Sequence, residues 1–384
     1  MAVPKIRIKG YTDEWVKKGL TDTVELFGGL TYTPSNIRES GTLVLRSSNV
    51  QNGEISLLDN VFVESSVVNS PFVQKGDIIV VVRNGSRALI GKHAHIKEDI
   101  NNAVIGAFMS GIRHKNSEFI NALLDTSNFH SEVDKNLGAT INQITNATFR
   151  SMIFNFPSDA EQRALGNFFD TLDNQITMQT SRIATLKQTK QASLQSMFPQ
   201  EGETKPRVRF KGFEGDWSKT TFGDLLSFER PDNYIVTNDK YSDNYFTPVL
   251  TANKGFILGY TNETRTYNKK CIIFDDFTLD NKYVDFPFMV KSSALKILTL
   301  KKPEVDNLYF IYALLNRTNI EVLGHARHYI SVVQPTEVLV PADCNEQKQI
   351  AEYFSNLDKQ ISIQEQRLEK LKQIKSACLK NMFV

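Results

Sequence analysis

Residues 161–176 read EQRALGNFFDTLDNQI, and residues 346–361 read EQKQIAEYFSNLDKQI. The correspondence continues without gaps from Glu161 to Phe198 in the first copy and from Glu346 to Phe383 in the second. A segment that recurs with this similarity marks a structural unit that the chain uses twice. The sequence therefore predicts an internally repeated architecture.

Apolar residues in both copies recur at steps of three and four, which is the pattern of an amphipathic helix. We expect the following residues to pack along the two helices: Leu165, Phe169, Leu172, Ile176, Ile183, Leu186, Ile350, Phe354, Leu357, Ile361, Leu368 and Leu371. Polar residues interrupt both stripes at equivalent places, Gln179 with Gln364 and Lys190 with Lys375, and such residues fix the register of coiled coils. Acidic residues lie early and basic residues late in each copy, which suits the dipole of each helix and also favours antiparallel pairing. The sequence thus predicts an antiparallel coiled coil of two helices, each about 55 Å long.

A shorter repeat precedes each long one. Residues 4–11 resemble residues 206–213, and each stretch is followed by one of the two tryptophans of the chain, Trp15 and Trp217. Between the repeats, residues 27–136 and 229–323 show no similarity to each other. We expect an α+β protein with a pseudo-twofold internal repeat: a first variable domain of mixed α/β structure (1–155), a first helix (156–200), a second variable domain (201–340) and a second helix (341–384).

The composition is that of a folded, water-soluble protein. Of the 384 residues, 41% are hydrophobic and 23% are charged, and the length suits two domains. Three scattered cysteines without a Cys-x-x-Cys pair favour neither disulfides nor a zinc cluster, and the first residues lack the apolar stretch of a signal peptide. We expect a cytoplasmic protein. A net charge of only +2 restricts any nucleic-acid contact to local patches.

Two unlike domains held apart by a rigid helix pair match a ligand that is itself nearly twofold symmetric, and duplex DNA is the commonest such ligand. Paired DNA readers usually address half-sites about 34 Å apart, which helices of this length can span. Because the variable domains differ, the half-sites should differ. The expected target is an asymmetric, interrupted DNA sequence.

The first variable domain offers one candidate reading element. Ile78–Val82 is expected to be a buried strand, and Asn84-Gly85 is a favoured dipeptide for a tight hairpin turn. The expected DNA contacts are Arg83, Asn84, Ser86, Arg87 and Lys92. Arginine can bond guanine and asparagine adenine, while serine and lysine suit phosphates. An ordinary solvated loop is the alternative.

The second variable domain is harder to interpret. Polar turns are expected at 251–255 and at 281–283, and loops of similar position precede the two helices at 138–144 and 324–330. The candidate contacts are Thr251, Asn253, Lys254, Lys282, Tyr283, Thr140, Asn142, Gln143, Arg327 and His328. Plain solvated loop is the alternative for the turns. Most of the 25 phenylalanines should be buried, but one or two exposed on a hairpin would suit thymine methyl groups, and the sequence does not say which.

These features together resemble the specificity subunits of type I restriction-modification systems. The resemblance covers nearly the whole chain and rests on three motifs: the entrance Arg-Phe-Lys-Gly-Phe-Glu-Gly-Asp-Trp at 209–217, the helix signature beginning at Glu161 and again at Glu346, and its continuation Leu-Lys-Gln-x-Lys. The segment from Arg83 to Lys92 also looks like a recurring target-domain segment. The entrance of the first half, Tyr11 to Trp15, departs from the fuller motif, so the start of that domain is less sharply defined.

The resemblance implies target recognition domains that each read one half of a bipartite site, with the conserved helices as a spacer. It implies two modification subunits, which methylate adenine at N6 with S-adenosylmethionine, and restriction subunits, which translocate and cleave DNA with ATP and magnesium. Those cofactors would belong to the partners, and this chain would hold none. It would be a non-catalytic subunit that fixes the complex on bases flanking the extruded adenine.

Alternatives are a coiled-coil scaffold without nucleic acid and a stand-alone methyltransferase or nuclease. Residues 85–92 have the wrong spacing for a phosphate loop, and the segment 285–288 lacks the first proline of a methyltransferase motif. Asp232 with 280–282 makes only a distant match to a nuclease site. His93 and His95 would share a strand face, but without a third ligand they are expected to be ordinary histidines rather than metal ligands.

Overall fold

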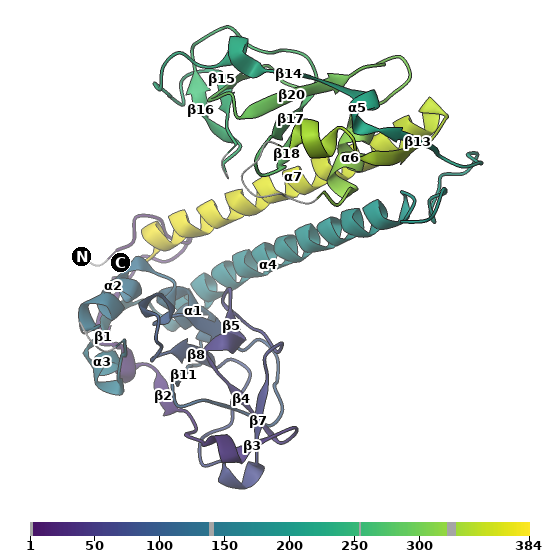
Figure 1. Ribbon diagram of the computed structural model, residues 1–384. Coiled ribbons are helices and arrows are strands. Elements are labelled where there is room, and N and C mark those ends of the chain that lie inside the picture. The colour runs from purple at the N-terminus through teal and green to yellow at the C-terminus, as the bar shows by residue number, and fades with distance from the viewer. Residues whose placement is uncertain (1–2, 138–141, 253–254, 321–327) are drawn as a thin grey trace. The chain divides into compact units, whose positions relative to one another are not determined.

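The computed structural model describes residues 3–137, 142–252, 255–320 and 328–384. The chain divides into two compact units. The first unit contains Met1–Thr180 and Gln366–Val384, and the second contains Ser181–Glu365. Two long helices, α4 (Asp159–Ser196) and α7 (Cys344–Met382), each contribute one part to each unit (Figure 1).

The rest of the first unit is a mixed α/β structure. Its strands are β1 (Val16–Gly19), β2 (Glu25–Gly28), β3 (Ile37–Arg38), β4 (Thr42–Leu45), β5 (Val50–Gln51), β6 (Glu54–Ile55), β7 (Val61–Val63), β8 (Ile78–Val81), β9 (His93–His95), β10 (Ala103–Ile105), β11 (Met109–Arg113) and β12 (Ile153–Phe156). Its shorter helices are α1 (Ser117–Leu124), α2 (Ser127–Asn136) and α3 (Asn146–Ser151).

Strand β8 lies at the centre of the first unit. Its sheet has the order β2-β11-β8-β9 and is antiparallel throughout. Neighbouring residues of a strand point to opposite faces, and all four residues of β8 are buried. Ile78 and Val80 join the core that includes α1, while Ile79 and Val81 join the core shared with the second sheet, β10-β4-β7-β3. The apolar run that predicts a buried strand thus serves two cores at once.

The second unit is built from the same kinds of element. Its strands are β13 (Ser218–Thr221), β14 (Leu226–Glu229), β15 (Thr247–Leu250), β16 (Ile257–Thr261), β17 (Cys271–Asp275), β18 (Asn281–Val284), β19 (Met289–Val290), β20 (Leu295–Leu300) and β21 (Glu337–Val340). Its shorter helices are α5 (Phe222–Leu225) and α6 (Leu308–Arg317).

The two variable regions share one sheet topology although their sequences do not align. The antiparallel order β14-β20-β17-β18 repeats the order β2-β11-β8-β9. The order β16-β15-β19, with its one parallel pair, repeats β7-β4-β10. The two-stranded sheets β1-β12 and β13-β21 also correspond. The expected mixed α/β domains are therefore present. The internal repeat also includes the variable regions, whose sequences show no similarity to each other.

The start of each long helix packs into the unit that it follows. In the first unit, Leu165, Phe169 and Leu172 belong to the same core as Trp15 and the chain end at Phe383. In the second unit, the core likewise unites residues of early α7, Ile350, Phe354 and Leu357, with residues of late α4, Leu194, Met197 and Phe198. The beginning of one helix thus lies with the end of the other in each unit, which is the expected antiparallel direction.

The apolar stripe serves these cores as well as helix pairing, because its early residues face the sheets. Ile183 and Ile361 are also buried, whereas four predicted packing residues are half-buried: Ile176, Leu186, Leu368 and Leu371. Supercoiling of the helices stays a prediction. The expected bounds of the variable domains also stay a prediction, because the boundary between the two compact units runs through both long helices.

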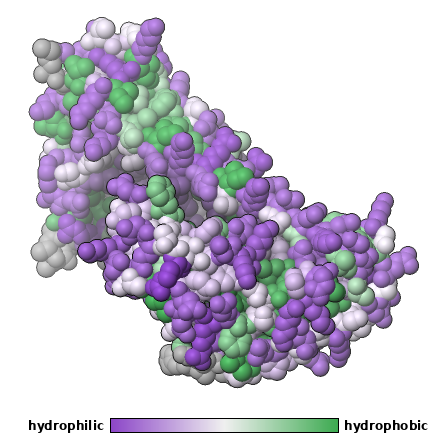
Figure 2. Space-filling view, turned by 90° about the horizontal axis from the view of Figure 1, so that it is seen from above, coloured by the Kyte–Doolittle hydropathy of each residue, from purple (hydrophilic) through white to green (hydrophobic). Residues whose placement is uncertain are grey.

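Polar residues dominate the face of the molecule seen in Figure 2, where hydrophobic residues form small groups among hydrophilic ones. None of the helices in the described residues combines the length and the apolar character that a membrane crossing requires.

Candidate functional site

An arginine–glutamate pair fixes each entrance segment to the first turn of a long helix. Arg7 makes two contacts of 2.8 Å with Glu161, and Arg209 makes two of 2.7 Å with Glu346. Both carboxylates are only 1% exposed, and hydrogen bonding to them raises the pKa of each arginine. A carboxylate also suits the positive end of the helix dipole. Sequence reasoning overlooked these pairs, although both partners recur in both repeats.

Aromatic contacts join each entrance to the far end of the other helix. The ring of Trp15 lies 6.0 Å from that of Phe383, and the ring of Trp217 lies 5.8 Å from that of Phe198, both edge-on. Edge-on contacts between buried rings add stability beyond the area that they bury. The two tryptophans and the two Met-Phe helix ends recur together in the sequence because they form one packing arrangement twice.

The late lysine of each helix binds the early aspartate of the other. In the first unit, Nζ of Lys375 lies 2.5 Å from Asp173 and 2.6 Å from Asp125 of the variable domain. In the second, Nζ of Lys190 lies 2.5 Å from Asp358, which also accepts a hydrogen bond from the hydroxyl of Tyr309. Burial alone would lower the pKa of Lys375, but the two carboxylates raise it. We call these contacts the lysine clasps.

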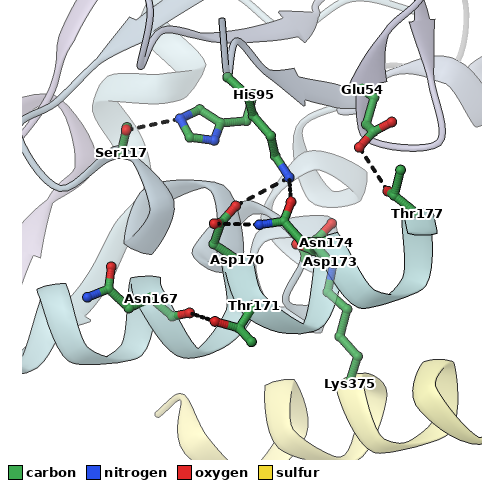
Figure 3. Close-up of polar contacts among 12 residues, drawn as sticks. Glu54, His95, Ser117, Asn167, Asp170, Thr171, Asp173, Asn174, Thr177 and Lys375 are labelled. Atoms are coloured by element: carbon green, nitrogen blue, oxygen red, sulfur yellow. Dashed lines mark hydrogen bonds and ion pairs between the residues drawn. The ribbon is translucent and has the colours of Figure 1, made fainter. Parts of the chain in front are cut away.

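Further polar contacts hold the first variable domain against α4 (Figure 3). Thr177 donates to Glu54 in β6 at 2.8 Å, and Lys97 bonds Asn174 at 2.6 Å. Behind them His95 contacts Ser117 at 3.0 Å, and burial lowers the pKa of His95. This network positions the domain against α4.

The segment that follows β8 departs from the predicted tight hairpin. Residues 82–92 form a longer loop, which includes a 3₁₀ turn at Arg87–Leu89 and closes where Gly91 donates to the carbonyl of Val81 at 2.9 Å. Gly91 has a φ of +83°, which glycine adopts without strain. The tight turn occurs instead at Asn52-Gly53 between β5 and β6, where both residues have positive φ. The tight hairpin predicted at Asn84-Gly85 is therefore wrong, and the other Asn-Gly dipeptide of the chain forms one.

The loop after β8 meets the segment that precedes α3. Arg83 forms a β-bridge with Gln143, and the amide of Asn142 donates to the carbonyl of Gly85 at 3.0 Å. Ile144 donates to the carbonyl of Val82 at 2.9 Å. Two candidate segments that are far apart in sequence therefore form one surface, which we call the first polar surface. Thr140 lies outside the described residues.

The candidate side chains on the first polar surface differ in how they are engaged. Arg87 is exposed and lies 3.7 Å from Asp134. The amide of Asn84 is half-buried and donates to Ser47 at 3.1 Å. Ser86 and Lys92 are exposed. The guanidinium carbon of Arg83 lies 5.1 Å from the centre of the Phe108 ring. The surface therefore presents cationic and amide groups of the kinds that contact DNA.

The second unit places its candidates differently. Residues 281–284 form strand β18 and not the expected turn, because they pair with β17. Tyr283 consequently packs against Tyr309, with the ring centres 4.7 Å apart, while Lys282 is exposed. Thr251 and Lys282 both line a polar cavity of 710 Å³ beside β17. Asn253, Lys254 and Arg327 lie outside the described residues.

His328 is not a surface residue, contrary to expectation. Its side chain is fully buried, and its Nδ1 lies 3.1 Å from the carbonyl oxygen of Asp276, the residue after β17. Asp276 also forms a buried ion pair of 2.9 Å with Lys296. The segment before the helix thus meets the loop after the central strand in both units, but in the second unit the contact is internal. His328 is corrected to a packing residue.

The two histidines of β9 each contact a polar neighbour. Both are buried, and His93 lies 3.4 Å from Asp125 while His95 contacts Ser117. In the ranges that the structure describes, no group of three or more histidine, cysteine, aspartate or glutamate residues is arranged to hold a metal ion.

Comparison with known proteins gives consistent matches. The family model described as "Type I restriction modification DNA specificity domain" matches residues 12–188 and 214–373. The type I restriction enzyme EcoR124I/EcoR124II specificity subunit of Escherichia coli is 40% identical over 146 residues, which cover 36% of this chain and 36% of that protein. The EcoKI specificity subunit of Escherichia coli (strain K12) is 26% identical over 225 residues, which cover 56% of this chain and 48% of that protein. The matches thus span about a third to a half of these relatives.

A solved structure supports the fold. The type I restriction-modification S subunit from M. genitalium matches with a TM-score of 0.73 and 15% identity, covering 100% of this chain and 99% of that one. At this identity the match concerns the fold alone. It agrees with two α/β units and two long helices.

Proposed function

The chain belongs to the type I restriction-modification DNA specificity domain family, and on that premise we propose that it is the DNA-recognition subunit of such a system and that each unit reads one half of a bipartite site. The observation that carries this proposal is one shared sheet topology in two variable regions whose sequences do not align. A common fold gives both domains the same means of docking, while different side chains give different base preferences. The expected target is therefore interrupted and asymmetric.

The chain is proposed to be non-catalytic, with catalysis left to partner subunits. Two modification subunits would use S-adenosylmethionine, and restriction subunits would use ATP and magnesium. Equivalent exposed apolar residues on the two long helices support two copies of one partner: Met178 on α4 is 72% exposed, and Ile363 at the same repeat position on α7 is 52% exposed. Large apolar side chains that are exposed at matching places suit partner contacts. The proposed location is the cytoplasm, where the DNA is.

Binding to duplex DNA at several salt concentrations tests the proposal. We expect the affinity of the full chain, alone or with its modification partners, to fall steeply with salt, because each phosphate contact releases counterions. Retention of the same affinity across the salt series, or the absence of any duplex binding, would favour the scaffold alternative. Methyl transfer by the purified chain alone would favour the enzyme alternative.

Mapping of N6-methyladenine in a strain with and without the gene identifies the target. We expect an interrupted motif with unlike halves. A palindromic motif would contradict the proposal, because the two units present different residues at their surfaces. Neighbouring genes for an adenine methyltransferase and a helicase-nuclease would support the proposed partners.

A further inference from the structure

Phe108 is an exposed aromatic residue that the structure holds in a fixed place. Its side chain is 55% exposed in the turn between β10 and β11. Its carbonyl accepts hydrogen bonds from the backbone N–H groups of Val82 at 3.0 Å and Arg83 at 3.2 Å. Single exposed apolar side chains are ordinary, so the exposure alone means little. These backbone hydrogen bonds place Phe108 at the edge of the first polar surface, beside the candidate DNA contact Arg83.

Arg83 lies over the Phe108 ring. The distance of 5.1 Å from the guanidinium carbon to the ring centre is within the range of a cation–π contact. Arg46 and Arg113 each bond a carboxylate, of Asp59 and Asp77 respectively. Within the described residues, no hydrogen bond or ion pair engages the Arg83 side chain. The ring therefore orients an arginine whose donors are available to a ligand.

The chemistry of the pair matches two different base edges. Arginine bonds O6 and N7 of guanine, and an apolar side chain contacts the methyl group of thymine in the major groove. The 5.1 Å separation lies between one and two base-pair rises of about 3.4 Å each, so the two groups can reach neighbouring base pairs. Gln143 and Asn142 lie beside Arg83, and amides of this kind suit adenine. One side of the first unit thus gathers complementary groups for several bases.

Building on the proposed function, we infer that Phe108 and Arg83 read neighbouring base pairs in the half-site of the first unit. Phe108 contacts a thymine methyl group, and Arg83, held by the Phe108 ring, bonds the adjacent guanine. Phe108 is thus a specificity-determining residue in its own right and also a positioning residue for Arg83.

Replacement of single thymines by deoxyuridine tests the inference directly, because deoxyuridine lacks only the methyl group. Once the target is mapped, duplexes that carry one such replacement each are titrated with the full-length protein or its complex. We expect one thymine next to a guanine in one half-site to show an affinity loss of about fourfold, as for one buried methyl-sized group. In Phe108→Ala that loss should vanish, while in Phe108→Leu, which keeps an apolar side chain, it should persist.

The matched control is Phe246→Ala in the second unit, where the side chain is 93% exposed. This variant should keep the deoxyuridine effect of the first half-site. Emission of Trp15 in a Trp217→Phe background reports whether each first-unit variant folds, and Phe108→Leu serves if Phe108→Ala does not fold. A second readout is 7-deazaguanine at the adjacent guanine, which should weaken binding to the wild type but not to Arg83→Ala.

The results of these binding experiments distinguish a failure of the role of Phe108 from a failure of the proposed DNA recognition. If the protein binds an interrupted site but deoxyuridine costs the wild type and Phe108→Ala equally at every position, the role of Phe108 is refuted and DNA recognition stands. A first half-site that lacks a T·A pair next to a G·C pair refutes it as well. If no duplex binds at all, the proposed function itself has failed.

Discussion

The amino group of Lys375 in α7 lies 2.5 Å from the carboxylate of Asp173 in α4, and the equivalent clasp in the second unit joins Lys190 of α4 to Asp358 of α7. Each repeat therefore supplies the lysine to one unit and the aspartate to the other. A polar pair in an otherwise apolar seam is a known way to fix helix register and direction. This reciprocity is what an antiparallel pair of equivalent helices requires.

Removal of one partner from a lysine clasp should destabilise its own unit. We expect Asp173→Asn to lower the free energy of unfolding of the first unit by about 2 kcal/mol, because Lys375 is mostly buried and loses one of its two carboxylates. Urea unfolding followed by Trp15 emission in a Trp217→Phe background measures this change. Lys190→Ala is the matched control, since its effect should fall on the second unit. Equal loss in both units from Asp173→Asn would contradict the local role of the clasp.

The arginine–glutamate pairs should matter more, because their carboxylates are almost fully buried. We expect Glu346→Gln to cost the second unit about 3 kcal/mol, since Arg209 loses its charged partner in a site from which water is largely excluded. Unfolding followed by Trp217 emission in a Trp15→Phe background reports the change. Glu161→Gln should affect the first unit to a similar extent. If Glu346→Gln leaves the midpoint of the second transition unchanged, the entrance segment is not held by this pair.

Arg87→Ala should weaken or relax recognition of only one half of the target. Arg87 is exposed, and its guanidinium donates to the carbonyl of Asp134 at 3.4 Å and lies 3.7 Å from the Asp134 carboxylate, so a base edge would replace this surface contact. Loss of one such contact should reduce discrimination at its position about tenfold. Binding to a panel of duplexes with single base changes measures it. Equal loss at both halves would contradict the assigned role.

Lys92→Ala is the informative comparison for Arg87→Ala. Lys92 is exposed on the same loop and suits a phosphate. Its loss should weaken binding to all duplexes alike and reduce the slope of log affinity against log salt by about one. A change in base preference in this variant would instead place Lys92 against a base.

Acid should destabilise the first unit. Burial lowers the pKa of His95, His114 and His130, all in that unit, from the ordinary value of 6.5. The unfolded chain therefore binds more protons than the folded one as the pH falls through and below 6.5, so stability is lost in that direction. We expect the Tm seen by Trp15 emission in the Trp217→Phe background to fall between pH 7.5 and pH 5.5, and less so when His95→Gln is added. A Tm that rises on acidification would contradict the sign of these shifts.

The two long helices could be predicted from the sequence because their contacts are local. The contacts that define α4 and α7 lie three and four residues apart, so the apolar stripe and its polar interruptions are visible in a short window. Strand β8 was equally visible as an apolar run. The turn that follows β8 was not predicted correctly, because Asn-Gly occurs at both 52–53 and 84–85. Only the pairing of neighbouring strands decides which of the two dipeptides forms a tight hairpin turn.

The sequence alone determined the duplication, the two long helices and the family, because those features are carried by local periodicity and by repeated motifs. The charge gradient favoured antiparallel helices, and the cores of the two units show that direction. Only the tertiary structure decided that the dissimilar variable regions share one sheet order, that His328 is buried, and that Arg83 meets both Gln143 and Phe108. The physical reason is that strand pairing joins residues distant in the chain. A two-residue alternation says which face of a strand is buried, but it does not say which strand lies beside it.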